Sequence, residues 1–478
     1  MSEHFDLVVI GAGPAGEKGA AQAAYFGKKV CLVERAPKPG GTAVNSGTLS
    51  ARTLRETALV FSGLRKKGLY GVEFLVRPDL TIADFLHRER QVVEASWQLI
   101  EENLERYQVA TVQGAACFTD PRTLEVTRHG QETRQLTADA FLIATGSHPG
   151  RPAGVPFDGA VVIDSDDVLS MQAIPARMVI IGGGVMGCEF ASIFGALGVK
   201  VTIVEQDDRL LAGFDHDVSD TLRQEFTRQF GIQAHVGIDV TAIEVRDGLG
   251  HGTLADGTTL FAECVLHCAG REGSTADLGL AHAGVATNAH GFIQVDDKFR
   301  SSITHIYAAG DVIGFPGLAS TSMEQARVAV CHAFDLKYKQ AVARFQPFGV
   351  WTIPEVATVG LSEHEARALD LGCETGKASF RANPRAQILG ETEGFVKLVF
   401  RLDDQRLLGA AIVGEGACEL IHLASAVLGF GGTIDYFIQA VFSYPTLSDA
   451  YKYAAYDGLQ RMQKKMRESG GLKAAAEG

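Results

Sequence analysis

The chain has 478 residues, 46% of them hydrophobic, and its 57 acidic residues outnumber its 44 basic residues, which gives a net charge of -13. This length predicts about three domains, and the acidic balance disfavours nucleic acid or an acidic membrane surface as a partner. We find no apolar run of the roughly 20 residues that cross a bilayer and no leader before the first strand, so we predict a cytoplasmic protein. The eight cysteines lack metal-ligand spacing, and we predict no metal site.

The first predicted elements form a dinucleotide-binding unit. An apolar strand over residues 7–10 leads into a glycine-rich turn and an alanine-rich helix to Tyr25, and a second strand over 30–33 ends in an acid. The glycines permit a tight turn and the approach of a pyrophosphate to the helix N-terminus, and the acid receives a ribose hydroxyl. The residues of this fingerprint are Gly11, Gly13, Gly16 and Glu34.

The same pattern recurs in the middle of the chain. Strand 178–181, a glycine-rich turn, helix 188–197 and strand 201–204 follow in the same order, and the acid lies at the same distance from the first glycine as before. Two such units predict two bound dinucleotides. The second fingerprint consists of Gly182, Gly184, Gly187 and Glu205.

The acid of the second unit bears on the choice of nucleotide. Glu205 favours a free 2′-hydroxyl and therefore NAD(H), because the 2′-phosphate of NADP(H) would meet a like charge. Arg209 and Lys200 are the nearby cations that could moderate this repulsion.

A third element follows at residues 304–311, where a predicted strand ends in Gly310-Asp311 and a helix follows Leu318-Ala319. Another short motif, Ala144-Thr145-Gly146, ends the first unit. Both motifs bear on which cofactor the first unit binds once a wider resemblance is considered.

Five stretches resemble the soluble pyridine nucleotide transhydrogenases, a group within the pyridine nucleotide-disulfide oxidoreductase flavoproteins. They are 163–171, 309–320, 352–355, 385–388, and Tyr444-Pro445-Thr446 with Ala450-Tyr451. The similarity covers nearly the whole chain. It implies an α/β fold like that of glutathione reductase, with two Rossmann-like dinucleotide-binding domains and an α+β C-terminal dimerisation domain, and hence a homodimer or a higher homo-oligomer.

The resemblance also implies domain boundaries. Residues 1–150 and 275–345 are predicted to bind FAD, 151–274 to bind NAD(P), and 346–466 to form the dimer interface. The segment 467–478, rich in glycine, alanine and charge, is predicted to be a disordered tail.

By the same resemblance, FAD occupies the first unit and a nicotinamide nucleotide the second. Asp311 would accept a hydrogen bond from the ribityl chain, and the helix that begins near Ala319 would face the flavin pyrimidine. The remaining predicted FAD residues are Gly41, Thr42, Thr145 and Gly146, and Gly270 is assigned to the nicotinamide nucleotide.

The family's redox loop carries two cysteines in the pattern G-G-x-C-x-x-x-x-C, and residues 40–48 resemble it. Here Ala43 and Thr48 stand at the two cysteine positions. We interpret them as inert loop residues. Because they replace both cysteines, electrons on the flavin cannot leave through a disulfide.

Three residues are candidates for a place beside the flavin. Relatives pair a Lys with a Glu near flavin N5, and the matching residues are Arg52 and Glu189; the alternative is an ion pair on a helix face, worth little. Tyr444 and Asp449 replace the family's His and Glu acid/base pair. A phenol is a poor base at neutral pH, so Tyr444 either caps the flavin of the partner subunit or is an interface tyrosine without a catalytic part.

The implied function is an FAD-dependent transhydrogenase that moves hydride between NADPH and NAD⁺ through flavin N5 in a ping-pong cycle, without a redox disulfide. An alternative is an NAD(P)H:quinone or dye reductase, in which a flat acceptor reaches the vacant thiol face. A third possibility is a non-catalytic flavoprotein scaffold or redox sensor, which the intact second fingerprint argues against.

Overall fold

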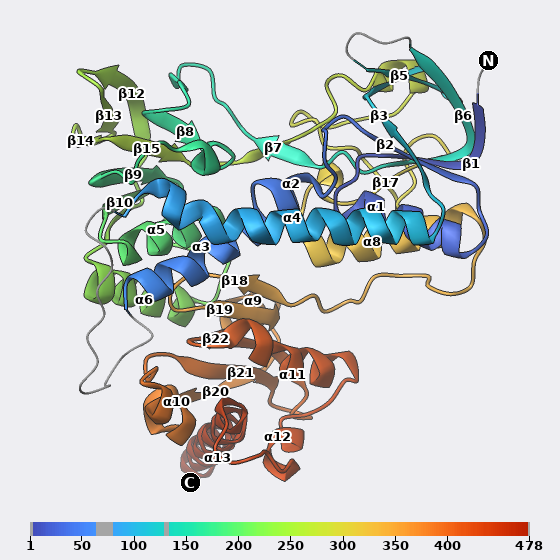
Figure 1. Ribbon diagram of the computed structural model, residues 1–478. Coiled ribbons are helices and arrows are strands. Elements are labelled where there is room, and N and C mark those ends of the chain that lie inside the picture. The colour runs from blue at the N-terminus through green and yellow to red at the C-terminus, as the bar shows by residue number, and fades with distance from the viewer. Residues whose placement is uncertain (1–2, 64–79, 129–132, 477–478) are drawn as a thin grey trace.

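The computed structural model describes residues 3–63, 80–128 and 133–476, with side chains as far as residue 468. Its sheets form two bodies side by side and a third beneath them, and the helices α3 (Thr48–Phe61) and α4 (Ile82–Arg106) run across the front of the upper two (Figure 1). This mixed α/β architecture agrees with the predicted fold class.

The first sheet has a parallel centre in the order β3-β2-β1-β6, and β17 adds to the far side of β6 in parallel. Strands β5 and β4 extend the opposite end of β6 in antiparallel fashion. The last four residues of β1 are all buried, as expected of a parallel strand covered on both faces. The strands are β1 (Glu3–Ile10), β2 (Val30–Glu34), β3 (Ala110–Gln113), β4 (Ala115–Asp120), β5 (Thr123–Thr127), β6 (Arg134–Ile143) and β17 (Ile306–Ala308).

Helices α1 (Pro14–Tyr25) and α8 (Ala319–Ala333) lie together against the first sheet (Figure 1). Their approach is close because small residues face each other: a Cβ on Gly19 would lie 3.3 Å from the Cβ of Ala326. Helix α8 is the helix predicted to follow Leu318-Ala319, and it packs on the helix that the N-terminal turn begins.

The second sheet is parallel throughout, in the order β11-β10-β9-β15-β8. Helix α5 (Val185–Ala196) covers it and buries ten of its twelve residues. An antiparallel sheet of β12 (Val240–Arg246), β13 (Leu249–Leu254) and β14 (Thr259–Ala262) lies beside it. The strands of the parallel sheet are β8 (Val162–Asp164), β9 (Arg177–Ile181), β10 (Lys200–Glu205), β11 (Gln233–Val236) and β15 (Cys264–His267).

A short antiparallel pair, β7 (Ser147–Pro149) with β16 (Arg271–Gly273), brings together the two chain segments that pass between the first and second sheets. The third body is an antiparallel sheet in the order β18-β19-β22-β21-β20. Its strands are β18 (Phe348–Val350), β19 (Val356–Gly360), β20 (Cys373–Ser379), β21 (Phe395–Arg401) and β22 (Leu407–Val413), and its main helices are α11 (Ala417–Gly429) and α13 (Ala450–Ala476).

A buried lysine joins the second body to the third. The Nζ of Lys397 on β21 lies 2.9 Å from Asp215, which caps α6 (His216–Glu225), and 2.8 Å from Glu363 on α9 (Glu363–Ala368). Asp217 completes the cluster at 3.1 Å. Because the side chains of Lys397 and Asp215 are only 5% and 2% exposed, this cluster is a desolvated link between the bodies.

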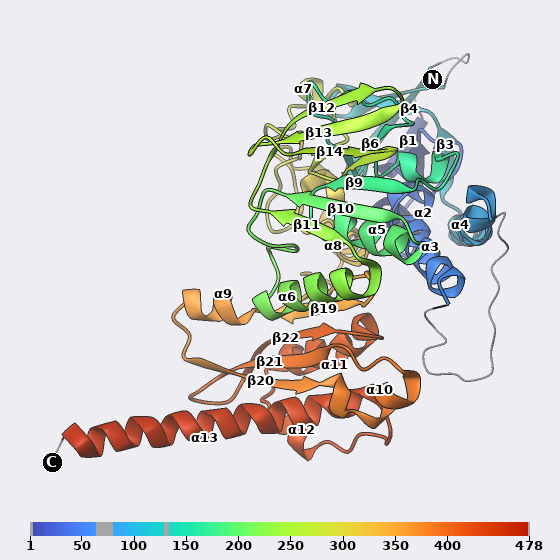
Figure 2. The ribbon, with the colours of Figure 1, turned by 90° about the vertical axis from the view of Figure 1, so that its left-hand side faces the viewer.

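Helix α13 differs from the sequence expectation at its end. It continues to Ala476, through most of the segment 467–478 that was predicted to be disordered, and it projects along the third body (Figure 2). Lysine and alanine in this segment favour helix, and the helix already begun at Ala450 supplies the nucleus. Within the described residues no helix is long and apolar enough to span a membrane.

Candidate active site

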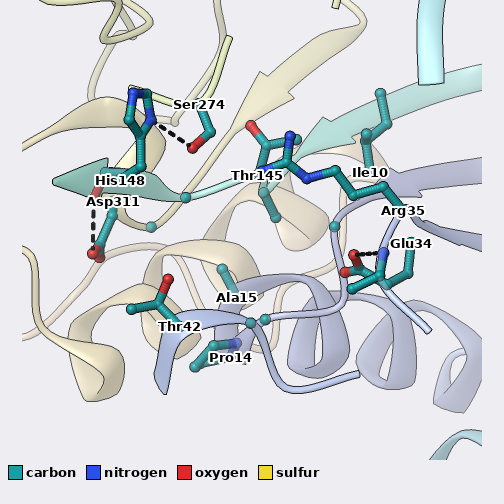
Figure 3. Close-up of a pocket in the computed structure, with 18 of the residues that line it drawn as sticks. Ile10, Pro14, Ala15, Glu34, Arg35, Thr42, Thr145, His148, Ser274 and Asp311 are labelled. Atoms are coloured by element: carbon teal, nitrogen blue, oxygen red, sulfur yellow. Dashed lines mark hydrogen bonds between the residues drawn. The ribbon is translucent and has the colours of Figure 1, made fainter. Parts of the chain in front are cut away.

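A cavity of about 560 Å³ runs along the carboxyl ends of the first sheet, beside the first glycine-rich turn. It is formed by segments from 10–15, 33–36, 41–48, 114–116, 144–148, 274–278 and 309–322, together with Asp166. Glu34 and Arg35 lie toward one end, and Asp311 and Thr42 lie toward the other (Figure 3). The crevice outside the strand ends is where open α/β sheets bind their ligands.

Backbone geometry explains the first fingerprint. Gly11 has a φ of +100°, which side-chain-bearing residues rarely adopt. A Cβ on Gly16 would lie 1.8 Å from the carbonyl oxygen of Gly11, so only glycine lets the helix pack on the turn. The Glu34 carboxylate accepts the N–H of Ala12 at 2.7 Å and the N–H of Ala36 at 2.8 Å, which fixes it at the cavity edge.

Two polar side chains of the cavity lack strong protein partners. The Oγ1 of Thr145 is buried without any hydrogen bond. The carboxylate of Asp311 receives only long contacts of 3.4 Å, from Ser147 and Ser322. Buried polar groups are almost always satisfied, so these atoms fit a polar ligand in this cavity. The shape, the turn and the acceptors together fit a dinucleotide.

Nine of the ten predicted FAD residues line this cavity, and the tenth, Gly16, lies behind the turn. Sequence reasoning missed Arg35, His148 and Ser274, which also line it. His148 Nδ1 lies 3.3 Å from the Oγ of Ser274, across the β7/β16 pair (Figure 3). Arg35 follows Glu34 directly and could have been found from its position; the other two come together only through tertiary structure.

The redox-loop positions also face this cavity. Ala43 on α2 (Gly41–Asn45) and Thr48 at the start of α3 both line it, and no cysteine is among its described lining residues. All eight cysteines, each within the described chain, are free. Burial raises the pKa of Cys264 and that of Cys268 to about 12, so neither is a reactive thiolate at neutral pH.

The stretch Asp164-Ser165-Asp166, which had no assigned role, supports this loop. Asp166 accepts a hydrogen bond from the Oγ of Ser46 at 2.9 Å and lines the cavity. Asp164 accepts the Nε–H of Arg151 at 2.8 Å and the backbone N–H of Asp166 at 2.9 Å. The second body thus holds the loop that closes the first site.

The second glycine-rich turn has the same local geometry. Gly182 has a φ of +103°, and a Cβ on Gly187 would lie 1.8 Å from the carbonyl oxygen of Gly182. Glu205 accepts the N–H of Gly183 at 2.5 Å and the N–H of Asp207 at 2.9 Å. Gly184 and Gly270 face open space, with no atom within 4 Å of an added Cβ.

Arg209, one of the two cations predicted to moderate the charge of Glu205, is held by other groups. Arg209 donates to Asp208 at 2.9 Å and to the carbonyl of Ala212 at 2.8 Å, although its Nε is buried without a partner. Both oxygens of Glu205 are occupied by backbone donors, and two further acids, Asp207 and Asp208, follow it. The preference for NAD(H) that Glu205 predicts stays a prediction.

Arg52 and Glu189 approach each other without a direct ion pair between them. The backbone N–H of Trp351 donates to Glu189 Oε1 at 2.8 Å, and the guanidinium of Arg52 lies 5.1 Å from the ring centroid of Trp351. Burial raises the pKa of Glu189 and lowers the pKa of Arg52, although each partner's charge opposes the shift. Their role at a flavin stays a prediction.

Tyr444 lies far from these groups along the chain and is 75% exposed. It does not line the cavity of its own chain. Asp449 ends the short turn Leu447–Asp449 that precedes α13. A role for Tyr444 at a partner's flavin stays a prediction.

Comparison with known families assigns the class. A model described as pyridine nucleotide-disulphide oxidoreductase matches residues 5–333, and the dimerisation domain of the same family matches residues 346–455. The chain therefore belongs to the pyridine nucleotide-disulphide oxidoreductases. Membership implies an oxidoreductase that uses a flavin and a nicotinamide nucleotide, and a chain that carries the family's dimerisation domain.

Two relatives and two solved structures are similar to this chain over nearly its whole length. A soluble pyridine nucleotide transhydrogenase from Mycobacterium bovis is 42% identical over 96% of this chain and 98% of its own length. One from Aliivibrio fischeri is 36% identical over the same shares. The crystal structure of LpdA from Mycobacterium tuberculosis matches with a TM-score of 0.86 and 26% identity over 94% of this chain and 99% of that one. RclA from Escherichia coli, an HOCl-induced flavoprotein disulfide reductase, matches with a TM-score of 0.84 and 26% identity over 95% and 99%.

Proposed function

We propose that this protein is an FAD-dependent transhydrogenase that moves hydride between NADPH and NAD⁺ without a redox disulfide. The observation that carries the proposal is the combination of two dinucleotide turns with a cavity in which Ala43 and Thr48 occupy the redox-loop positions. The names of the relatives from Mycobacterium bovis and Aliivibrio fischeri support the same reaction.

FAD is the proposed occupant of the cavity. Glu34 would hold the adenosine ribose, Thr145 and Asp311 would supply the polar contacts, and the turn at Gly11 would receive the pyrophosphate. When bound, the flavin supplies N5 as the acceptor and donor of hydride. The residues 1–150 with 275–345 are proposed as the domain that holds it, and 151–274 as the domain that brings the nicotinamide nucleotide.

The chain's own contribution is proposed to be positioning and charge. Arg52 supplies a cation beside the flavin, and the second turn orients the nicotinamide nucleotide through Gly182, Gly184 and Glu205. Hydride moves as one unit, so no acid/base side chain is required. This fits Tyr444, a poor base, at the position of the family's histidine.

A homodimer is proposed through residues 346–466. Several apolar side chains there are exposed on the single chain, which suits a surface covered by a second copy. They are Tyr436, Val441, Tyr444, Tyr453 and Tyr456 on or near α12 (Asp435–Gln439) and α13.

The quinone or dye reductase is the competing function, and the small side chain of Ala43 at the cavity wall favours it. Purified protein is mixed with NADPH and thio-NAD⁺ under nitrogen, and thionicotinamide reduction is followed. A second reaction replaces thio-NAD⁺ with a benzoquinone. Transfer between the nicotinamides supports the proposal. Negligible transfer with rapid quinone turnover would replace it with the competing function.

A further inference from the structure

Trp351 contacts both residues of the pair that the family places beside the flavin. It lies between β18 and β19, in the third body, whereas Arg52 is on α3 and Glu189 on α5. Its ring centroid is 5.1 Å from the Arg52 guanidinium, within the roughly 6 Å of a cation–π contact. Its backbone N–H holds Glu189 at 2.8 Å. One residue therefore links the three bodies at this point.

Glu189 is withdrawn from Arg52. Its carboxylate is 6% exposed and bonded to Trp351, and no ion pair within 4.0 Å joins it to Arg52, both being described residues. Burial raises the pKa of Glu189, although the charge of Arg52 opposes the shift. The two charges therefore act on each other without a direct contact that would fix the orientation of the guanidinium.

Arg52 needs another group to fix its plane. Its Nε is buried and makes no hydrogen bond, so hydrogen bonding leaves the orientation of the guanidinium underdetermined. A guanidinium is flat and stacks on aromatic faces. Arg52 does not itself line the cavity, but it follows the lining residue Thr48 by one helical turn, so the two side chains share a face of α3.

We propose that Trp351 is a positioning residue, whose ring holds the Arg52 guanidinium one turn along α3 from the cavity-lining Thr48, while its backbone N–H anchors one oxygen of Glu189. The inference rests on the proposed function only in requiring a flavin in the cavity. A cation held beside the isoalloxazine ring raises the affinity of bound flavin for an electron pair. Without the tryptophan ring, Arg52 is free to turn to Glu189 or to water.

The test is a double-mutant cycle of Trp351→Leu, Arg52→Gln and both together. FAD content, melting temperature, the two-electron midpoint potential of the bound flavin and the rate of flavin bleaching by NADH are measured for each. We expect Trp351→Leu to lower the potential and to slow bleaching about twofold to fivefold, the range of a partly exposed cation–π contact. In the Arg52→Gln background the same change should have no further effect.

Trp351→Phe keeps a ring face and should restore most of the potential. If Trp351→Leu fails to fold, Trp351→Met, which also lacks a ring, replaces it in the cycle. Equal effects of the tryptophan change in both backgrounds would overturn the inference, because a purely structural role is additive.

The proposed function can fail separately. Coupling between Trp351 and Arg52 in a flavin-loaded protein that transfers nothing between nicotinamides would refute the transhydrogenase and leave the inference standing. Intact transfer with additive effects would refute only the inference.

Discussion

The two glycine-rich turns share a backbone and differ in what surrounds them. Gly11 and Gly182 have φ values of +100° and +103°, and each following acid accepts two backbone N–H groups. Around the first turn, segments from 10–148 and 274–322, together with Asp166, close a cavity. Around the second, Gly184 and Gly270 face open space.

This difference fits the two ligands proposed for them. A resident cofactor gains from enclosure, because each wall adds contacts and excludes water, whereas a nucleotide that must enter and leave in every cycle needs an open approach. The second turn belongs to the body that the ion pairs of Lys397 join to the third sheet. These ion pairs lie outside the predicted nucleotide site.

The largest effect on stability is expected from removing the charge of the buried Lys397. Lys397→Met leaves Asp215 buried and unpaired, which should lower the free energy of unfolding by about 3–5 kcal/mol. Lys377→Met is the matched control: Lys377 also pairs with Asp217, at 3.3 Å, but is 35% exposed, and its loss should cost less than about 1 kcal/mol. Urea unfolding measures both. Equal losses would mean that the buried link is not what holds the second turn's body.

The same cluster sets a pH window. Burial acts to raise the pKa of Asp217 and to lower the pKa of Lys397, but their ion pairs outweigh it, so the pKa of Asp217 is lowered and that of Lys397 raised. The stabilisation is therefore present between about pH 4 and about pH 10, the unfolded pKa values of an acid and a lysine. It is lost as the pH falls through the folded pKa of Asp217 or rises through that of Lys397. The stability gap between wild type and Lys397→Met should shrink at both extremes.

Next in size are matched changes in the two turns. Gly16→Ala and Gly187→Ala each place a Cβ 1.8 Å from a backbone oxygen and should cost about 1–3 kcal/mol or more. Gly16→Ala should also reduce the FAD content of purified protein, whereas Gly187→Ala should keep FAD and raise the KM for NADH. Gly372→Ala, which meets no atom within 4 Å, is the control. Loss of FAD from both variants would show that the turns are not independent.

A smaller effect is expected at the acid of the open turn. Glu205→Arg removes a carboxylate where a 2′-phosphate would lie and should shift the NADPH to NADH ratio of kcat/KM about tenfold toward NADPH, equivalent to about 1.4 kcal/mol. Asp208→Arg changes the charge equally at an exposed position and should shift the ratio less. An unchanged ratio in Glu205→Arg would mean that Glu205 does not contact the ribose.

The smallest effect is expected at a buried acid, Glu89, which Ser50 links to the redox-loop segment 40–48. Burial raises the pKa of Glu89, whose carboxylate lies 2.7 Å from the Oγ of Ser50, and that Oγ lies 3.1 Å from the Val44 carbonyl beside Ala43. An acid with a raised folded pKa loses stability as the pH rises above its unfolded pKa of about 4.3. Glu89→Gln should therefore unfold at a higher temperature than wild type at pH 8 and at a similar temperature at pH 4. A constant difference across this range would contradict the assignment.

The sequence by itself determined both dinucleotide turns, the strands and helices around them, and nine of the residues that line the first cavity. Its signals there are local: a turn that only glycine can make, an apolar strand before it, and an acid at a fixed spacing.

Only the tertiary structure decided the contacts between distant segments. His148 with Ser274, Asp166 with Ser46, Lys397 with Asp215, and Trp351 between Arg52 and Glu189 each join positions far apart in the chain. Such pairs carry no periodicity or spacing, because their separation is set by how the sheets pack. The expected pairing of Arg52 with Glu189 shows the limit: the two residues were found by resemblance, but Trp351, which contacts both, was not.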